Sequence, residues 1–175
     1  MPNDLLYQVA LTLIPNIGSV QAKTLIEHFG SAEQIFKTSL KKLGLIEQIG
    51  EVRAGSIKAF DDFETAEKEI AFIDKYKIQP LFITDNTYPR RLLKCYDAPV
   101  LLYYRGTADL NAAKIISIIG TRNSTDYGKQ VCEKLIADLQ EQKILVVSGL
   151  AFGIDAVAHK AALQNDLATV GVLAH

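Results

Sequence analysis

The sequence contains no tryptophan, a single methionine and only two cysteines. Cys95 and Cys132 stand alone, without the spacing of metal ligands, so we expect free thiols in a reducing compartment. No apolar run approaches the ~20 residues that span a bilayer, and the start at Pro2-Asn3-Asp4 lacks the basic character of a secretory signal. These absences argue against a disulfide scaffold, a cysteine-ligated metal site and a membrane protein. They predict a cytoplasmic location.

An excess of charge of either sign is also missing. The 19 lysines and arginines are balanced by 20 aspartates and glutamates, which gives a net charge of −1. A protein that holds duplex DNA on a broad basic surface usually shows a basic excess, so this balance argues mildly against nonspecific duplex binding. It leaves room for a small site built from a few cations and backbone amides.

Apolar residues are abundant, at 49% of the chain, and charged residues make up 22%. A chain of 175 residues with this composition can build a real core, and its length suits one full domain plus a smaller one. The patterns described below divide it into a helical domain over residues 1–78 and an α/β domain over residues 79–175.

The helical domain contains an internal repeat. Residues 13–22 recur as residues 45–54, with the Leu, Ile, Ile, Gly, Val and Ala positions shared. A period in this range indicates a duplicated supersecondary unit. Each copy predicts a helix, a tight turn at Ile-Gly and a second helix with one apolar face, which is the helix-hairpin-helix pattern. Two copies predict a compact bundle of four or five short helices.

Such hairpins bind phosphate where the turn glycine lets the backbone approach DNA and the next helix start offers its amides. The first copy, at Gly18, suits this role. The second copy carries Glu47 and Glu51 at the same hairpin, where carboxylates repel phosphate, and acids outnumber cations over residues 1–80. The pattern therefore favours packing or partner docking for this domain, with DNA contact as the alternative.

The middle of the chain mixes helix and strand. Residues 60–76 predict an amphipathic helix, with apolar residues at helical spacing. Short strands are predicted at residues 80–84 and 100–104, and between them residues 85–93 predict a turn and a short helix. The cations of this segment favour a solvated face over a binding patch.

From residue 114 onward the pattern is β-α-β-α-β. Residues 115–119 form a near-continuous apolar run, as expected for a strand buried on both faces of a parallel sheet. The helix that follows is predicted to be capped by Ser124 or Thr125 and to face the sheet with Val131, Leu135, Ile136 and Leu139. The remaining elements are a strand at 144–147, a helix at 154–164 and a strand at 168–173. Three strands make a small doubly wound sheet, so we expect the polypeptide to be truncated.

Two turns follow the first two strands of this sheet, where ligands bind in open parallel sheets. Their glycines allow close backbone approach, and the amides at the next helix start favour an anion. Arg122 adds a donor fork suited to phosphate, and Phe152 is placed to stack on a base. The turns predict a site for a nucleotide or a short single strand of nucleic acid. The candidate residues are Gly120, Thr121, Arg122, Ser124, Ser148, Gly149, Phe152 and Gly153. The alternatives are a structural salt bridge for Arg122 and packing under the loop for Phe152.

Enzyme motifs are lacking at these turns. Neither the Gly-x-Gly-x-x-Gly dinucleotide fingerprint nor the Gly-x-x-x-x-Gly-Lys-Ser/Thr loop is present. Asp155 and His159 lie four apart and share a helix face, but no nucleophile or third ligand accompanies them. We expect a capping or hydrogen-bonding role for Asp155 rather than catalysis. No cofactor, no metal and no catalytic residue are predicted.

The two turns, in this order, resemble signatures of the DNA-processing protein A (DprA/Smf) family. Residues 119–128 resemble its Gly-Ser-Arg-x-x-Ser-x-Tyr-Gly signature, and residues 148–163 resemble its Ser-Gly-x-Ala-x-Gly-Ile-Asp…Ala-His…Ala-Leu signature. Tyr88-Pro89, Leu92, Asp97, Pro99 and Arg105-Gly106 are similar to the segment that enters its extended Rossmann domain. The helical repeat is similar to its amino-terminal SAM-like domain.

This resemblance implies an α+β protein of two domains, a SAM-like domain of two helix-hairpin-helix units and an incomplete, extended Rossmann-like domain with a parallel sheet. It implies a cytoplasmic bacterial protein that binds and protects single-stranded DNA and loads the RecA recombinase in natural transformation. It also implies a homodimer of the full-length protein, Arg122 as a phosphate ligand, and no catalytic residue. Thr121 replaces the family's usual serine, Lys160-Ala161 stands where Arg-Gly is common, and Asn165-Asp166 where a glycine pair is common.

Two further functions stay open at the level of sequence. The first is a Rossmann-like enzyme that hydrolyses a nucleotide, which needs a carboxylate paired with the glycine-rich turn. The second is a protein-docking module that uses the helical domain alone.

Overall fold

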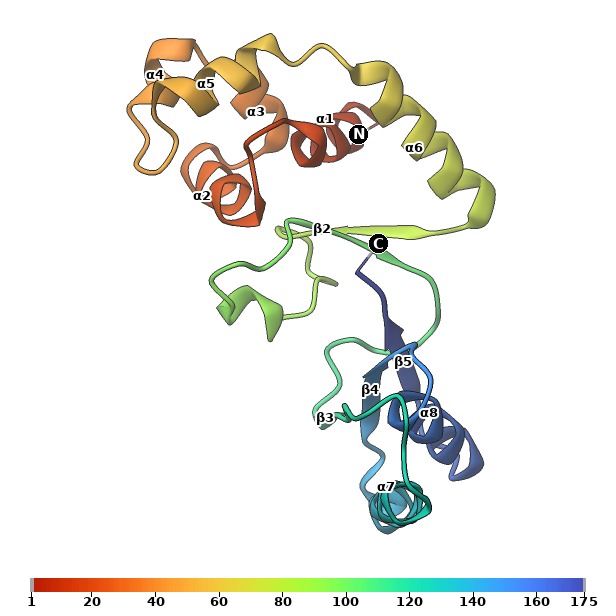
Figure 1. The fold of residues 1–175 in the computed structure, drawn as a ribbon. Helices are drawn as coiled ribbons and strands as arrows, with labels where there is room; N and C mark the ends of the chain where they lie inside the picture. Colours follow the sequence, from red (N-terminus) through yellow and green to blue (C-terminus); the bar gives the residue numbers. More distant parts are fainter. Residues whose placement is uncertain (1, 175) are drawn as a thin grey trace. The chain divides into compact units, whose positions relative to one another are not determined.

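The computed structural model describes residues 2–174, and the side chains of residues 4–174. The chain divides into two compact units, one up to Arg105 and one from Gly106 (Figure 1). The predicted domain boundary between residues 78 and 79 stays a prediction. It lies where the first strand begins, inside the first compact unit. Among the described residues, no helix combines the length and apolar character that a membrane span requires.

The described part of the first unit begins with six helices, of which five cover the two repeat copies and the sixth is the helix predicted over residues 60–76. They are α1 (Pro2–Leu13), α2 (Ser19–Phe29), α3 (Ala32–Lys37), α4 (Leu40–Gly44), α5 (Gly50–Ala59) and α6 (Phe63–Tyr76). The two copies of the repeat form the α1–α2 and α4–α5 hairpins. Three pairs of equivalent apolar positions are buried in both copies: Ile17 and Ile49, Ala22 and Ala54, Leu25 and Ile57. The duplication therefore serves to bury the same face of each hairpin.

Aromatic rings join the ends of this helical region. Tyr7 of α1 lies 5.4 Å from Phe36 of α3 and 5.9 Å from Phe63 of α6, measured between ring centroids. The Asp62 side chain caps α6 by accepting from the Thr65 amide. This hydrogen bond lowers the pKa of Asp62 below its ordinary value. The cap and the rings together fix where α6 begins.

A two-stranded antiparallel sheet completes the first unit. It pairs β1 (Gln79–Phe82) with β2 (Leu101–Tyr104), and the loop between them contains the 3₁₀ helix η1 (Leu92–Lys94). Tyr88 is buried in this loop, and its hydroxyl donates to the Pro99 carbonyl at 2.5 Å. Burial raises the pKa of Tyr88 to about 12. The Tyr-Pro segment thus holds the loop closed from within.

The second unit is a three-stranded parallel sheet in the order β3-β4-β5 with two helices. Its elements are β3 (Ile115–Ser117), α7 (Asp126–Asp138), η2 (Gln140–Gln142), β4 (Leu145–Gly149), α8 (Ile154–Gln164) and β5 (Thr169–Val172). Two successive crossovers of the same hand between neighbouring strands put both helices on one face of the sheet. Helices α7 and α8 pack against each other accordingly.

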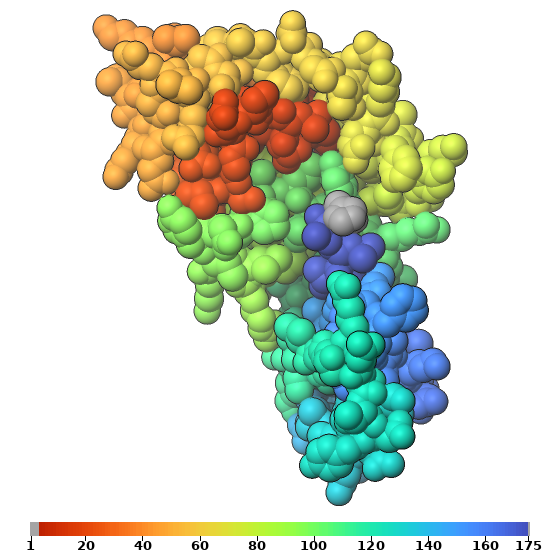
Figure 2. Space-filling view, in the orientation of Figure 1, coloured from red at the N-terminus to blue at the C-terminus, as the bar shows by residue number. Residues whose placement is uncertain are grey.

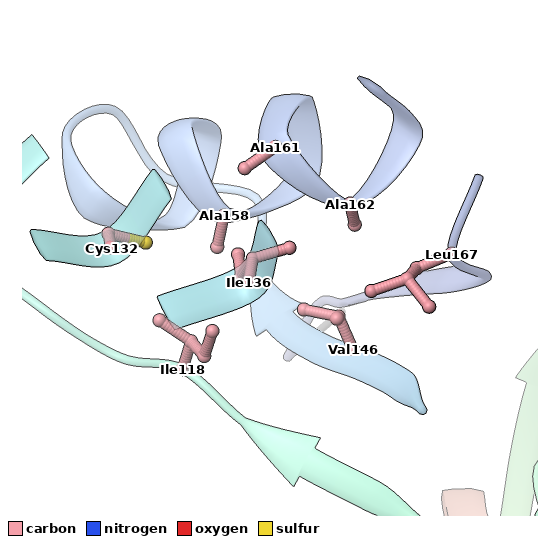
Figure 3. Close-up of a cluster of buried hydrophobic side chains, with 8 residues drawn as sticks. All are labelled: Ile118, Cys132, Ile136, Val146, Ala158, Ala161, Ala162 and Leu167. Atoms are coloured by element: carbon pink, nitrogen blue, oxygen red, sulfur yellow. The ribbon is translucent and has the colours of Figure 1, made fainter. Parts of the chain in front are cut away.

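The core of the second unit lies between these helices and the sheet. It is built from Ile118, Cys132, Ile136, Val146, Ala158, Ala161, Ala162 and Leu167 (Figure 3). The three alanines of α8 present short side chains to the core, and the axial distance between packed elements depends on the size of the side chains in contact. The larger fully buried side chains of this core therefore come from α7, β4 and the residues next to β3 and β5, while Ile154 and Val157 of α8 pack at its margin.

Two expectations about this unit are wrong. The run 115–119 is not buried on both faces, because α7 and α8 share one face and Ile119 is 83% exposed. The face predicted for helix α7, which is teal in Figure 2, is only partly right. Ile136 is buried and Leu139 is half-buried, as expected, but Val131 and Leu135 are exposed and Cys132 is buried. Residues four apart line one helix face, and neighbours in sequence lie about 100° around the axis. At these two positions the larger side chains, Val131 and Leu135, suggested the wrong residues, each one position before a residue that is buried.

Candidate functional site

The two candidate turns pack directly on each other. The Ile154 amide, at the start of α8, donates to the Thr121 carbonyl at 3.2 Å. Gly153 has a φ of 87°, and a Cβ there would overlap the Thr121 carbonyl and lie 2.5 Å from the Arg122 carbonyl oxygen. Only glycine combines this backbone conformation with this contact. The turn after β3 and the turn after β4 are thus one joined edge.

Ile154 occupies the centre of this edge. A Cβ on Gly120 would lie 2.6 Å from the Ile154 Cβ, and a Cβ on Gly128, in the first turn of α7, would lie 3.8 Å from the Ile154 Cδ1. The first turns of α7 and α8 therefore meet at this side chain. Gly120 was expected to leave room for a ligand, but Ile154 fills the space beside its Cα.

Two predicted site residues lie beneath the second turn. Ser148 is buried, and its hydroxyl donates to the Ile118 carbonyl at 2.7 Å, which ties β4 to the end of β3. A Cβ on Gly149 would lie 2.6 Å from the Asp155 Oδ2. The Ser148 side chain thus supports the turn from the core side, and Gly149 gives the Asp155 carboxylate room to pack.

The expected cap exists at α7 but not at α8. Thr125, rather than Ser124, is the N-cap of α7, and its hydroxyl accepts from the Gly128 amide at 3.1 Å. The N-cap of α8 is Gly153, which has no side-chain cap. Asp155 is buried, and its Oδ1 has no hydrogen-bond partner among the described residues. Its carboxylate interacts with the helix dipole at the first turn instead of closing a cap.

The outer surface of the edge carries a cation and an aromatic ring. Arg122 is exposed, and among the described residues no carboxylate forms an ion pair with it, so the salt-bridge alternative has no support. Phe152 is 86% exposed, which rules out packing under the loop. The Thr121 hydroxyl accepts from the Asn123 amide at 3.2 Å and closes the first turn, and Ser124 is half-buried.

Sequence reasoning missed other exposed apolar side chains at the same edge. Tyr127, in the first turn of α7, is 77% exposed, and Ile119 and Leu150 are also exposed. Contiguous exposed apolar surface marks interaction sites in soluble proteins. The tyrosine of the family signature pointed to Tyr127, whereas Ile119 was interpreted as the end of a strand and Leu150 as an ordinary turn residue.

A shallow cavity of about 440 Å³ lies elsewhere in this unit. It is lined by residues of the loops before β4 and β5, including Lys143 and Asp166, and by Asp109 of the segment before β3. In parallel sheets the amino ends lie opposite the ligand-binding edge. Within residues 4–174, no three His, Cys, Asp or Glu side chains gather as metal ligands. The described geometry therefore offers an open surface at the turns rather than an enclosed pocket.

Comparison with known proteins gives two family matches. Residues 79–175 match the model of DNA recombination-mediator protein A, and residues 8–70 match a helix-hairpin-helix motif. The protein Smf of Synechocystis sp. is 32% identical over 178 residues, which is 95% of this chain and 43% of that protein. The DNA processing protein DprA of Streptococcus pneumoniae is 43% identical over 97 residues, which is 55% of this chain and 34% of that protein.

A solved structure supports the same fold. The X-ray structure of DNA processing protein A from Streptococcus pneumoniae superposes with a TM-score of 0.74 at 29% identity, covering 95% of this chain and 56% of that chain. The chain spans less than half the length of the two sequence relatives. The predicted fold, a helix-hairpin-helix domain followed by a parallel α/β domain, is confirmed. The family match covers more than half of the chain, and the chain belongs to the DNA recombination-mediator protein A family.

Proposed function

We propose that this chain binds single-stranded DNA on the exposed surface of the two joined turns, without catalysing a reaction. One observation carries the proposal: an exposed cation without an ion-pair partner in the described chain and an exposed aromatic ring lie on two turns that contact each other. Arg122 and Phe152 project from turns whose backbones are in contact through Gly153. Their spacing is therefore set by the fold and not by flexible loops.

The chemistry of these two groups suits a single strand. A guanidinium binds phosphate oxygens through a planar fork of donors. An exposed ring stacks on a base whose face is free, which a single strand offers and a paired duplex does not. A net charge of −1 accords with a small site of this kind and not with a broad basic surface.

The role of the site in the cell follows from the family and is part of the proposal. Within the whole protein, the site holds incoming single strands, protects them and delivers them to the RecA recombinase in recombination or natural transformation, and the whole protein is a homodimer. Support comes from the family, whose model is described as a recombination mediator. RecA filament formation on single-stranded DNA, measured with and without this protein, checks the loading step. Sedimentation equilibrium checks the dimer.

Hydrolysis of a nucleotide is the alternative function, and it needs a carboxylate that faces the ligand. Asp155 lies against Gly149 but is buried, so it does not face the open surface. Incubation with nucleoside monophosphates, followed by chromatography for free base, tests the point. We expect no release, and release of base would replace the binding assignment with an enzymatic one.

Fluorescence anisotropy with a labelled oligothymidine, against a duplex of similar length, tests the proposal itself. We expect preferential binding of the single strand and a clear loss of affinity in Arg122→Ala. Lys134→Ala is the matched control, because it removes the same charge from an exposed position further along α7. Equal losses of affinity in the two variants would mean that Arg122 contributes only through overall charge and not through a specific contact. No binding by the folded chain would overturn the proposal.

A further inference from the structure

His159 is the one ring in the second unit bonded at both nitrogens among the described residues, and the proposed function does not use it. It lies on α8, one turn after Asp155, and is partly buried. Its Nε2 is 2.7 Å from the Gly149 carbonyl oxygen, and its Nδ1 is 2.7 Å from the Thr169 Oγ1. The ring therefore joins α8 to the end of β4 and the start of β5.

The partners fix the hydrogen on one nitrogen. A carbonyl oxygen only accepts hydrogen bonds, so Nε2 carries a hydrogen and donates it to Gly149. The Thr169 hydroxyl also lies 3.1 Å from the Val146 carbonyl, which anchors it to β4. The contact between Nδ1 and Thr169 thus sets the rotation of the ring, and the Nε2 hydrogen is aimed at a single acceptor.

That acceptor opens the second turn of the proposed DNA site. The peptide group that begins at Gly149 leads into Leu150 and, two residues later, to Phe152. Phe152 is almost fully exposed, so its own side chain has little packing to hold it. The backbone on either side must set its position.

Three contacts fix that backbone. The Gly149 carbonyl is held by His159, the Leu150 side chain lies against Gly171 of β5, and the Gly153–Ile154 end is held by Thr121. The Asp155 carboxylate packs on the Gly149 Cα in addition. Of the three, the His159 contact is the polar side-chain contact, and it acts where the chain leaves the sheet.

We propose that His159 is a positioning residue for the single-strand site: it holds the Gly149 carbonyl so that Phe152 stands beside Arg122. The inference rests on the proposed function and assigns a role to a residue that does not itself touch DNA. It predicts that the Nε2 contact, and not the ring as such, decides DNA affinity.

A pair of amide substitutions separates the two ends of the ring. The Gln amide nitrogen in His159→Gln reaches the position of Nε2 and continues to donate to Gly149. The Asn amide in His159→Asn reaches the position of Nδ1 and retains only the Thr169 contact. Both variants are neutral, and each keeps one of the two hydrogen bonds. A residue that merely stabilises the fold would give the two variants similar affinities at matched stability.

We expect oligothymidine affinity near wild type in His159→Gln and lower by up to about fivefold in His159→Asn, because His159 acts only through the stacking of Phe152. In a Phe152→Leu background, His159→Asn should cost little further affinity, because the ring that it positions is gone. Equal affinities of the Gln and Asn variants, or additive effects of His159→Asn and Phe152→Leu, would overturn the inference.

Amide hydrogen exchange gives a readout without DNA. The amides of residues 150–153 should exchange faster in His159→Asn than in His159→Gln, while the amides of α7 stay the same in both. Equal exchange in the turn contradicts positioning whatever the DNA data show. Faster exchange in a chain that binds no oligothymidine would overturn the proposed function and leave the hold of His159 on Gly149 established.

Discussion

The two turns at the edge of the sheet are built in different ways. The turn after β3 is closed by short-range hydrogen bonds, from the Asn123 amide to Thr121 and from the Gly128 amide to Thr125. The turn after β4 is held from outside, by His159 of α8 and by contact with the first turn. The first carries the cation and the second carries the aromatic ring. The turn that carries Arg122 is closed by its own hydrogen bonds. The position of Phe152, in contrast, depends on contacts that α8 and the first turn make with the second turn.

The largest expected effect comes from breaking the contact between the turns. In Gly153→Ala, the new methyl group meets the Thr121 carbonyl at a backbone φ of 87°. Strain and overlap together should lower the free energy of unfolding by about 3 kcal/mol. Urea unfolding followed by circular dichroism measures the loss.

Gly128→Ala is the control for that substitution. A Cβ there makes only ordinary contacts, at 3.4 Å from the Thr125 Oγ1. Its unfolding free energy should stay within about 1 kcal/mol of wild type. Similar losses in the two variants would mean that the turns are not held together through Gly153.

Removing the cation should have the next largest effect. Arg122→Ala should weaken oligothymidine binding about tenfold at low salt, since charge-assisted hydrogen bonds to phosphate are lost. It should also reduce the slope of log affinity against log salt by about one unit. Anisotropy titrations over a salt series give both quantities. An unchanged slope would place the phosphate contact elsewhere.

Removing the ring should weaken binding without changing the salt slope. Phe152→Ala should lower affinity about fivefold, at the lower end of what stacking on one base contributes. Phe152→Tyr retains a stacking face and should bind like wild type. If Phe152→Ala also reduces the slope of log affinity against log salt by about one unit, the phosphate contact and the base contact are not separated between the two turns as proposed.

The smallest effect should come from the local closure of the first turn. Thr125→Ala removes the N-cap of α7 and should lower the free energy of unfolding by about 1 kcal/mol. Thr125→Ser keeps the hydroxyl and should restore most of the loss. Thermal unfolding of the pair measures the difference. Indistinguishable midpoints would show that the Thr125 cap does not support this turn.

The difference between short-range contacts and contacts from other elements also explains which predictions from the sequence were accurate. The helix predicted over 154–164 is found as α8 at those residues, and Thr125 was one of two predicted caps. Both depend on neighbours within a few residues. The buried face of α7 was predicted correctly at Ile136 but not at Val131, because the packing of α8 and the sheet buries Cys132 instead. Asp155 was expected to cap the helix or form hydrogen bonds near its start, and its burial against Gly149 depends on the path of β4.

The sequence alone determined the order of elements, the repeated hairpin and the placement of both turns after parallel strands. Periodicity, caps and turn residues act over a few positions, so they can be read along the chain. Only the tertiary structure decided that Ile154 fills the space at Gly120, that Phe152 faces outward and that His159 holds Gly149. These contacts join residues that are distant in sequence or on different elements. Their geometry exists only once the sheet and the two helices have packed.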